Sequence, residues 1–178
     1  TGLGGRAFEA RAAQGRFAAV MDFSLQELVN DLAGSCVTAG PGRLLGAGGA
    51  GTPQIVAPGA TDMVDHPAWG APPARFAGGA FHAHNRLIAS TGIDVAMRRS
   101  VARAIGERLA QARGPATVLL PRQGIEGWDR PGQPMHDPDG LAALVDELPR
   151  ALQPGTGLVE LDAHINDDAF AQAALAVL

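Results

Sequence analysis

The sequence predicts one α/β domain, built on a mostly parallel, doubly wound sheet with helices on both faces. Short apolar runs typical of buried strands alternate along the chain with segments whose apolar residues recur at helical spacing. The 178 residues, 46% of them hydrophobic, suffice for one domain with its own core. The 24 glycines and 13 prolines predict many tight turns between these elements.

The N-terminal segment is predicted to hold two helices and two strands. Residues 1–5 form a Gly-rich turn that opens a helix, and a strand usually precedes such a turn. We therefore expect the chain to be the C-terminal half of a longer protein, with the preceding strand upstream. Residues 16–23 contain a strand, and Ser24 to Glu27 match the capping box of a second helix. Residues 35–39 predict another short strand.

The middle of the chain is rich in glycine and proline. Residues 41–51 indicate a turn followed by a helix of small residues, and residues 54–57 indicate a strand. Residues 65–79 are expected to form one long loop, because turn-forming residues are concentrated there. Residues 80–84 then predict the next strand.

The C-terminal half contains the clearest helical patterns. Thr91 and Asp94 form a second capping pattern before a helix whose apolar stripe includes Val101, Ile105 and Leu109. The elements expected after it are a strand at 116–120, a helix that begins at Asp137-Pro138 and ends or kinks at Pro149, a strand at 158–161 and a helix at 167–178. This alternation predicts a Rossmann-like or flavodoxin-like sheet in a single domain.

Charge and composition exclude several classes of function. The net charge is −4 without any basic run, so we expect no binding of nucleic acid by a charged surface. All 14 basic residues are arginine and there is no tyrosine, which excludes a lysine Schiff base, a P-loop lysine and a tyrosine general acid. We see neither a signal peptide nor a membrane-spanning stretch, and Cys36 is the only cysteine. A cytoplasmic protein without membrane contact is therefore expected.

Polar side chains gather where the predicted strands end. Ligands of open parallel sheets bind beyond the carboxyl ends of the strands. The candidates there for acid–base or metal chemistry are Asp62, His82, His84, Asp129 and His136.

The His82-x-His84 pair is the sharpest metal-ligand pattern. Residues two apart in a strand point to the same face, so both imidazoles could reach one metal ion, with Asp62 or Asp129 adding a carboxylate. The alternative is that the two histidines hydrogen-bond loops at the edge of the sheet. Two histidines without a fixed third ligand make a weak motif, so the sequence identifies no metal.

Gly-rich turns suggest an anion-binding site. Backbone amides at a helix N-terminus attract phosphate through hydrogen bonds and the helix dipole, although the glycines could serve tight packing alone. The candidate ligand-binding residues are Thr1, Gly2, Gly4, Gly5, Gly40, Gly42, Asn85 and Gly124.

The remaining reactive residue types favour structural roles. Cys36 starts an apolar run and is expected to be a buried structural cysteine. Ser90 lacks the nucleophile elbow of a hydrolase. Trp69 and Trp128 could stack on a ligand or cover apolar surface, and the arginine face of the helix after Asp94 is expected to be solvated.

Six ordered segments carry a resemblance to a known family. They are Thr1-Gly2-Leu3-Gly4-Gly5-Arg6-Ala7-Phe8-Glu9, Thr38-Ala39-Gly40-Pro41-Gly42-Arg43-Leu44, Pro58-Gly59-Ala60-Thr61-Asp62-Met63-Val64, His82-Ala83-His84-Asn85, the segment from Leu120 to Asp129 with His136-Asp137-Pro138, and Asp162-Ala163-His164-Ile165-Asn166-Asp167. Over essentially its whole length the chain resembles the C-terminal half of the Tm-one-like family, also catalogued as an uncharacterised protein family.

The resemblance implies an ATP-binding family with paired α/β subdomains. ATP is then the implied cofactor, and the N-terminal subdomain of the same protein is an implied partner. The plant member of the family inhibits viral RNA replication by binding the viral replication protein. The chain departs from the family where a lysine is replaced within Pro121-Arg122-Gln123, and where a Tyr or Phe is missing near His136. Arg122 could bind phosphate in place of that lysine but could not act as a base.

Two functions of different classes follow. The first is a ligand-binding or catalytic module for a nucleotide or another small phosphorylated ligand, with its site at the carboxyl ends of the strands. The second is a non-catalytic module for protein interaction or dimerisation, and an exposed sheet edge favours a homo-oligomer. The fold class by itself does not choose between them.

Overall fold

The computed structural model describes residues 4–178 and contains a four-stranded parallel sheet. Its strands are β1 (Val20–Asp22), β2 (Gln54–Val56), β6 (Ala116–Pro121) and β7 (Gly157–Leu161), in the order β1-β2-β6-β7. Every neighbouring pair is parallel, so the carboxyl ends of all four strands lie at one edge. The predicted α/β class is confirmed, and the strand order does not reverse within the described part of the chain.

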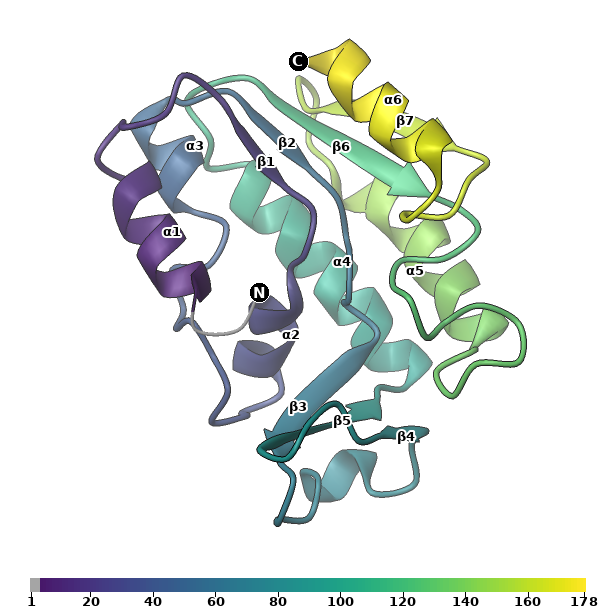
Figure 1. Cartoon of the computed structure of the whole chain (residues 1–178). Helices are drawn as coiled ribbons and strands as arrows, with labels where there is room; N and C mark the ends of the chain where they lie inside the picture. The colour runs from purple at the N-terminus through teal and green to yellow at the C-terminus, as the bar shows by residue number, and fades with distance from the viewer. Residues whose placement is uncertain (1–3) are drawn as a thin grey trace.

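Helices cover both faces of this sheet (Figure 1). Helices α4 (Val95–Leu109) and α5 (Pro138–Ala151) pack on one face, and α6 (Asp168–Val177) packs on the other. Successive residues of a strand point to opposite faces. Leu120 of β6 accordingly joins the α4 and α5 side, whereas Leu119 packs beside Phe170 of α6.

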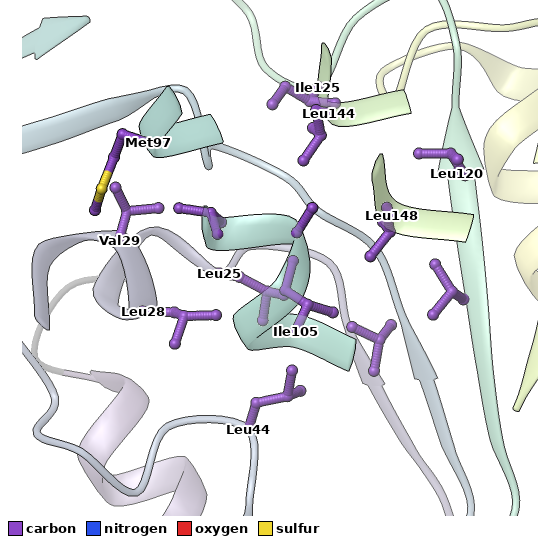
Figure 2. Close-up of a cluster of buried hydrophobic side chains, with 14 of the residues drawn as sticks. Leu25, Leu28, Val29, Leu44, Met97, Ile105, Leu120, Ile125, Leu144 and Leu148 are labelled. Atoms are coloured by element: carbon purple, nitrogen blue, oxygen red, sulfur yellow. The ribbon is translucent and has the colours of Figure 1, made fainter. Parts of the chain in front are cut away.

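The main core lies between the sheet and helices α2 (Gln26–Leu32), α4 and α5, as Figure 2 shows. Ile105 and Leu144 are almost completely buried there. Gly106 lets the two long helices approach closely, because a β-carbon at this position would lie 2.2 Å from the carbonyl oxygen of Ala151. Asp94 and Asp137 cap α4 and α5 by accepting hydrogen bonds from backbone amides in the first turn.

A buried arginine joins the N-terminal helices to the sheet. Arg43 is 2% exposed and forms ion pairs with Asp22 at the end of β1, Glu9 of α1 (Gly4–Ala12) and Glu27 of α2. It also donates to the carbonyl oxygen of Ser24. The segment after Arg43 continues into the short helix α3 (Gly46–Ala50).

A second, antiparallel sheet extends from the domain where one long loop is expected. It consists of β3 (Met63–Pro67), β5 (Ile88–Gly92) and β4 (Phe81–His82), in the order β3-β5-β4, with the short 3-10 helix η1 (Ala74–Phe76) between β3 and β4. The predicted loop over 65–79 is therefore wrong at 65–67, which belong to β3, and at the 3-10 helix, and the strand predicted at 80–84 is limited to Phe81–His82. Pairing of β3 with β5 supplies the hydrogen bonds that local turn signals could not indicate.

Several local predictions are also wrong because tertiary partners compete for the side chains. Residues 35–39 form no strand. The capping box does not form, since Leu25 and not Ser24 is the N-cap residue of α2, without a side-chain cap, and Glu27 pairs with Arg43 instead. Thr91 belongs to β5, so Asp94 alone of the predicted pair caps α4.

Three further expectations are corrected by burial and helix length. Pro149 lies within the last turn of α5, which continues to Ala151. Cys36 is exposed. Arg98 is buried between α4 and the start of α5, so the arginine face of α4 is only partly solvated. Within residues 4–178, no helix combines the length and hydropathy needed to cross a membrane.

Candidate functional site

The loops that follow β2 and β6 meet at the carboxyl edge of the parallel sheet. The amide of Ala60, in the first loop, donates to the carbonyl oxygen of Ile125 in the second over 3.0 Å. This contact brings two carboxyl groups, Asp62 and Glu126, close enough for each loop to influence the charge of the other. The sequence predicted Asp62 as a site residue but not Glu126.

Asp62 is a buried carboxyl group without a hydrogen-bond partner. Its side chain is 0% exposed, and neither carboxyl oxygen receives a hydrogen bond from another described residue. Burial raises its pKa to about 6, the positive charge of Arg98 opposes this shift, and the negative charge of Asp129 adds to it. A buried polar group without a partner is costly, so its presence marks a position that folding alone does not explain.

Glu126 is a second buried carboxyl group, 8% exposed. Its Oε2 accepts a hydrogen bond of 2.7 Å from the amide of Trp128, whereas Oε1 has no partner among the described residues. Burial and then the charge of Asp62 raise its pKa to about 8. At neutral pH Glu126 is therefore mostly protonated and can donate a hydrogen bond.

A cavity of about 550 Å³ lies beside Glu126 and has an aromatic wall. Trp128 and His84 line it together with Ser90 of β5. The His82 ring stacks on Trp128 with a centroid separation of 3.8 Å, and His84 meets the same indole edge-on at 5.3 Å. The two histidines of the antiparallel sheet thus fix the indole at the cavity, and polar groups converge there with an apolar surface.

Asp129, the other acidic candidate, stabilises the loop after β6 through hydrogen bonds. Its Oδ1 lies 2.8 Å from Nε2 of His164, and its Oδ2 accepts from the amides of Ile125 and Glu126. The amide of Asn166 donates to His164 Nδ1, so the ring proton lies on Nε2 and is donated to Asp129. His164 is 1% exposed. Asp129 therefore acts as a support for Glu126.

Gly124 is required by this support. It has a φ of +138°, and a β-carbon there would lie 2.3 Å from His164 Cδ2 and 2.6 Å from Asp129 Oδ1. Gly124→Ala should therefore separate His164 from Asp129 and reduce the free energy of unfolding by about 2–3 kcal/mol, from overpacking and backbone strain. Denaturant unfolding measures this loss, and Gly132→Ala, also at positive φ but with open space around it, is the control. Equal losses in the two variants would contradict the assigned contact.

The three predicted histidines differ in their distance from the Glu126 cavity, since His84 lines it, His82 stacks on Trp128 in its wall and His136 does neither. His136 is exposed, and its Nδ1 lies 2.8 Å from the backbone oxygen of Asp129. His84 follows β4 instead of belonging to it, but the rings of His82 and His84 lie 6.4 Å apart and both contact the Trp128 indole. Among residues 4–178 no group of three or more His, Cys, Asp or Glu side chains could hold a metal ion.

Backbone amides of the Gly-rich segments donate mainly to acceptors within the protein itself. Gly40 donates to the Thr38 hydroxyl, and the amides of Leu44 and Gly46 donate to the carboxylate of Glu9. Gly4 begins α1, and Gly5 packs against Glu27, where a β-carbon would lie 2.8 Å from Oε1. Gly42 is exposed. Thr1 and Gly2 lie outside the described residues.

The last two predicted contacts also have structural roles. The Asn85 side chain accepts from the amides of Leu87 and Ile88 in the turn before β5. Arg122, considered as a replacement for a phosphate-binding lysine, pairs with Glu160 at the surface over 2.9 Å. Asn85, Arg122 and the glycines predicted to bind a ligand therefore do not line the cavity beside Glu126.

Sequence reasoning missed Glu126 and Arg98. The signal for Glu126 was a single carboxylate between Ile125 and Trp128 in the loop after a buried strand, a setting in which an acidic side chain becomes desolvated. The position of Arg98 on α4 gave no such signal, because only the packing of α5 buries its guanidinium group beside Asp137, with an ion pair of 3.0 Å.

Comparison with known proteins shows which family the chain is similar to. The model of the uncharacterised protein family UPF0261, C-terminal domain, matches residues 1–178. The chain is 51% identical to a UPF0261 protein of Brucella melitensis over 99% of its own length and 42% of that protein. It is 30% identical to a UPF0261 protein of Clostridium tetani over 97% of the chain and 43% of that relative.

A plant protein is among the relatives. The chain is 29% identical to the ToMV resistance protein Tm-1 of Solanum lycopersicum, over 97% of the chain and 23% of the tomato protein. The chain thus spans less than half the length of each of these three relatives. Because the family model covers the chain from end to end, the chain belongs to the uncharacterised protein family UPF0261 and corresponds to its C-terminal domain.

Proposed function

We propose that this domain binds a small ligand with a planar ring, such as the base of a nucleotide, in the cavity between Glu126 and Trp128. The observation that carries the proposal is Glu126, a buried carboxyl group with an unpartnered oxygen in the wall of an aromatic cavity. A protonated carboxyl both donates and accepts a hydrogen bond, which matches the neighbouring acceptor and donor of a heterocyclic base.

Trp128 provides the second proposed interaction, which is stacking against the ring of the ligand. Stacking of a base on an aromatic side chain contributes about 1–3 kcal/mol per base. His82 and His84 hold the indole from the antiparallel sheet, so the surface is preorganised for a ring. The resemblance to an ATP-binding family supports the nucleotide class. With its proton, Glu126 is also placed to act as a general acid toward a bound ligand.

Tryptophan fluorescence tests the proposal directly. The chain has two tryptophans and no tyrosine, so Trp69→Phe leaves Trp128 as the single tryptophan reporter. We expect adenosine and ATP to change its fluorescence saturably and ribose 5-phosphate to leave it unchanged. In this background Glu126→Gln should weaken binding about tenfold, since it leaves one hydrogen bond imperfect. Glu107→Gln, on the exposed side of α4, is the matched control.

The pH dependence of the same titration separates stacking from the carboxyl contact. Because the pKa of Glu126 is raised to about 8, binding should weaken above pH 8 as the proton is lost, and Glu126→Gln should abolish that dependence. Trp128 fluorescence that stays unchanged with adenosine and ATP would contradict the proposal.

Binding of another part of a longer protein is the second candidate function. It is favoured by three exposed apolar side chains on or next to the strands of the antiparallel sheet, Trp69, Phe81 and Leu87, which are 77%, 57% and 65% exposed. The N-terminal subdomain of the same protein is the proposed partner, since the chain covers 42% of the Brucella relative. The absence of any nucleoside response in the titration above would favour this function.

A further inference from the structure

A second cavity, of about 340 Å³, lies on the other side of the loop that carries Asp62. Its wall shares no residue with the aromatic cavity beside Glu126. Asp62 lines it, and both of its unpartnered carboxyl oxygens are fully buried. A cavity of this size is within the range that holds small ligands.

The charges around this cavity favour a cation. Arg75 pairs with Asp94 over 3.2 Å, and Arg98 pairs with Asp137 over 3.0 Å, so these two pairs are each neutral. Asp62 is the remaining acidic group in the wall of the cavity, and the nearest opposing charge, on Arg98, is already paired with Asp137.

Asp129, which does not line this cavity, adds negative charge near Asp62. Asp129 and Asp137 both act on Asp62 as like charges, while Arg98 is the cation that opposes them. Glu126 also interacts with Asp62, but its raised pKa of about 8 leaves it mostly neutral at pH 7. An anionic ligand would therefore be repelled, and a cationic ligand would be attracted.

The donor set favours an ammonium group over a metal ion. Calcium and magnesium need several oxygen ligands, and no suitable group of three acidic or histidine side chains exists among residues 4–178. An ammonium group brings three hydrogen-bond donors and a positive charge to a carboxylate that receives no hydrogen bond from another described residue.

The rest of the wall fits an aliphatic stem. Phe76, Ile93 and Met135 contribute apolar surface. Gly79 closes the wall by backbone contact, because a β-carbon there would lie 2.3 Å from the carbonyl oxygen of Gly92. The combination of a buried carboxylate and a narrow apolar wall matches a short chain of methylene groups that ends in a charged nitrogen.

We propose that this cavity is a separate subsite for the primary ammonium group of a short aliphatic amine, held by Asp62. The inference is independent of the proposed function, since it concerns a different cavity and a ligand without a ring.

Calorimetric titration of the chain with butylammonium chloride tests the subsite, with 1-butanol as the neutral probe of similar shape and sodium chloride to match ionic strength. We expect one saturable site for butylammonium and no saturable heat with 1-butanol. Asp62→Asn should weaken amine binding at least tenfold. Asp168→Asn, an exposed substitution of the same type on α6, should leave it unchanged.

The pH dependence in the unsubstituted chain provides a measurement that needs no variant. Because the pKa of Asp62 is about 6, affinity should fall about tenfold per pH unit below that value as the carboxylate gains a proton. Equal binding of 1-butanol, full binding by Asp62→Asn, affinity that is constant between pH 5 and 7.5, or no saturable response to the amine would each overturn the proposal. Because no nucleoside is present, none of these results depends on the Glu126 cavity.

Discussion

Replacing Arg43 by methionine is expected to reduce the free energy of unfolding by about 3–5 kcal/mol, the usual cost of removing one partner from a buried ion pair. Arg43 compensates three acidic side chains at once, Asp22, Glu9 and Glu27. Methionine fills similar space but supplies neither charge nor hydrogen-bond donors. The carboxylate of Asp22, about 10% exposed, would then remain desolvated beside two others.

Chemical denaturation followed by circular dichroism measures this loss as a shift of the unfolding midpoint. Arg103→Met is the matched control, since Arg103 is half exposed and pairs with Glu147 at the surface of α4 and α5. Exposed pairs contribute less than about 1 kcal/mol, so the control should remain close to the unsubstituted chain. Similar midpoints for Arg43→Met and Arg103→Met would show that the buried network does not stabilise the fold as we infer.

Glu126→Gln is expected to stabilise the chain at alkaline pH, although it weakens ligand binding. The pKa of Glu126 is raised by burial from 4.5 to about 8, so the folded chain holds this proton more tightly than the unfolded chain does. The contribution of Glu126 to stability is complete below its unfolded pKa of 4.5 and is lost as the pH rises through about 8. Glutamine cannot ionise, and its side-chain oxygen can still accept the hydrogen bond from Trp128.

The stability that Glu126→Gln gains over the unsubstituted chain should increase with pH. Between pH 5 and pH 9 the stability difference between Glu126→Gln and the unsubstituted chain should change by about 4 kcal/mol, from the raised pKa at 1.36 kcal/mol per unit. Urea unfolding at several pH values gives this difference, with Glu107→Gln as the control. A difference that does not vary with pH would contradict the assigned burial of the Glu126 charge.

Asp62, like Glu126, makes the fold less stable as the pH rises. Burial raises its pKa to about 6, so its contribution to stability declines as the pH rises from about 4 to 6. Two neighbouring carboxyls that weaken the fold at neutral pH are unusual outside functional sites, where stability is often sacrificed for chemistry. Their cost to stability at the carboxyl edge supports the ligand sites that we propose there.

The α/β class and most long elements could be predicted from local patterns. Helix α4 has a continuous apolar stripe and α5 has Asp137-Pro138 at its start, and both signals depend only on residues close in sequence. Parallel strand β6 is buried on both faces and appears as a continuous apolar run. The antiparallel sheet was missed because β3 and β5 pair across more than 20 residues rich in turn signals.

The candidate site, like the fold, could be predicted from the sequence only in part. The sequence determined which segments follow the parallel strands, and so it indicated the carboxyl edge and Asp62 within it. Tertiary structure alone decided the roles of the other side chains. It placed His164 on Asp129, and it held Trp128 against His82 and His84. It also buried Glu126 beside Asp62, which raises the pKa of Glu126 and keeps this carboxyl group mostly protonated at neutral pH. The physical reason is desolvation. Desolvation depends on every neighbour in space, whereas sequence patterns report only neighbours along the chain.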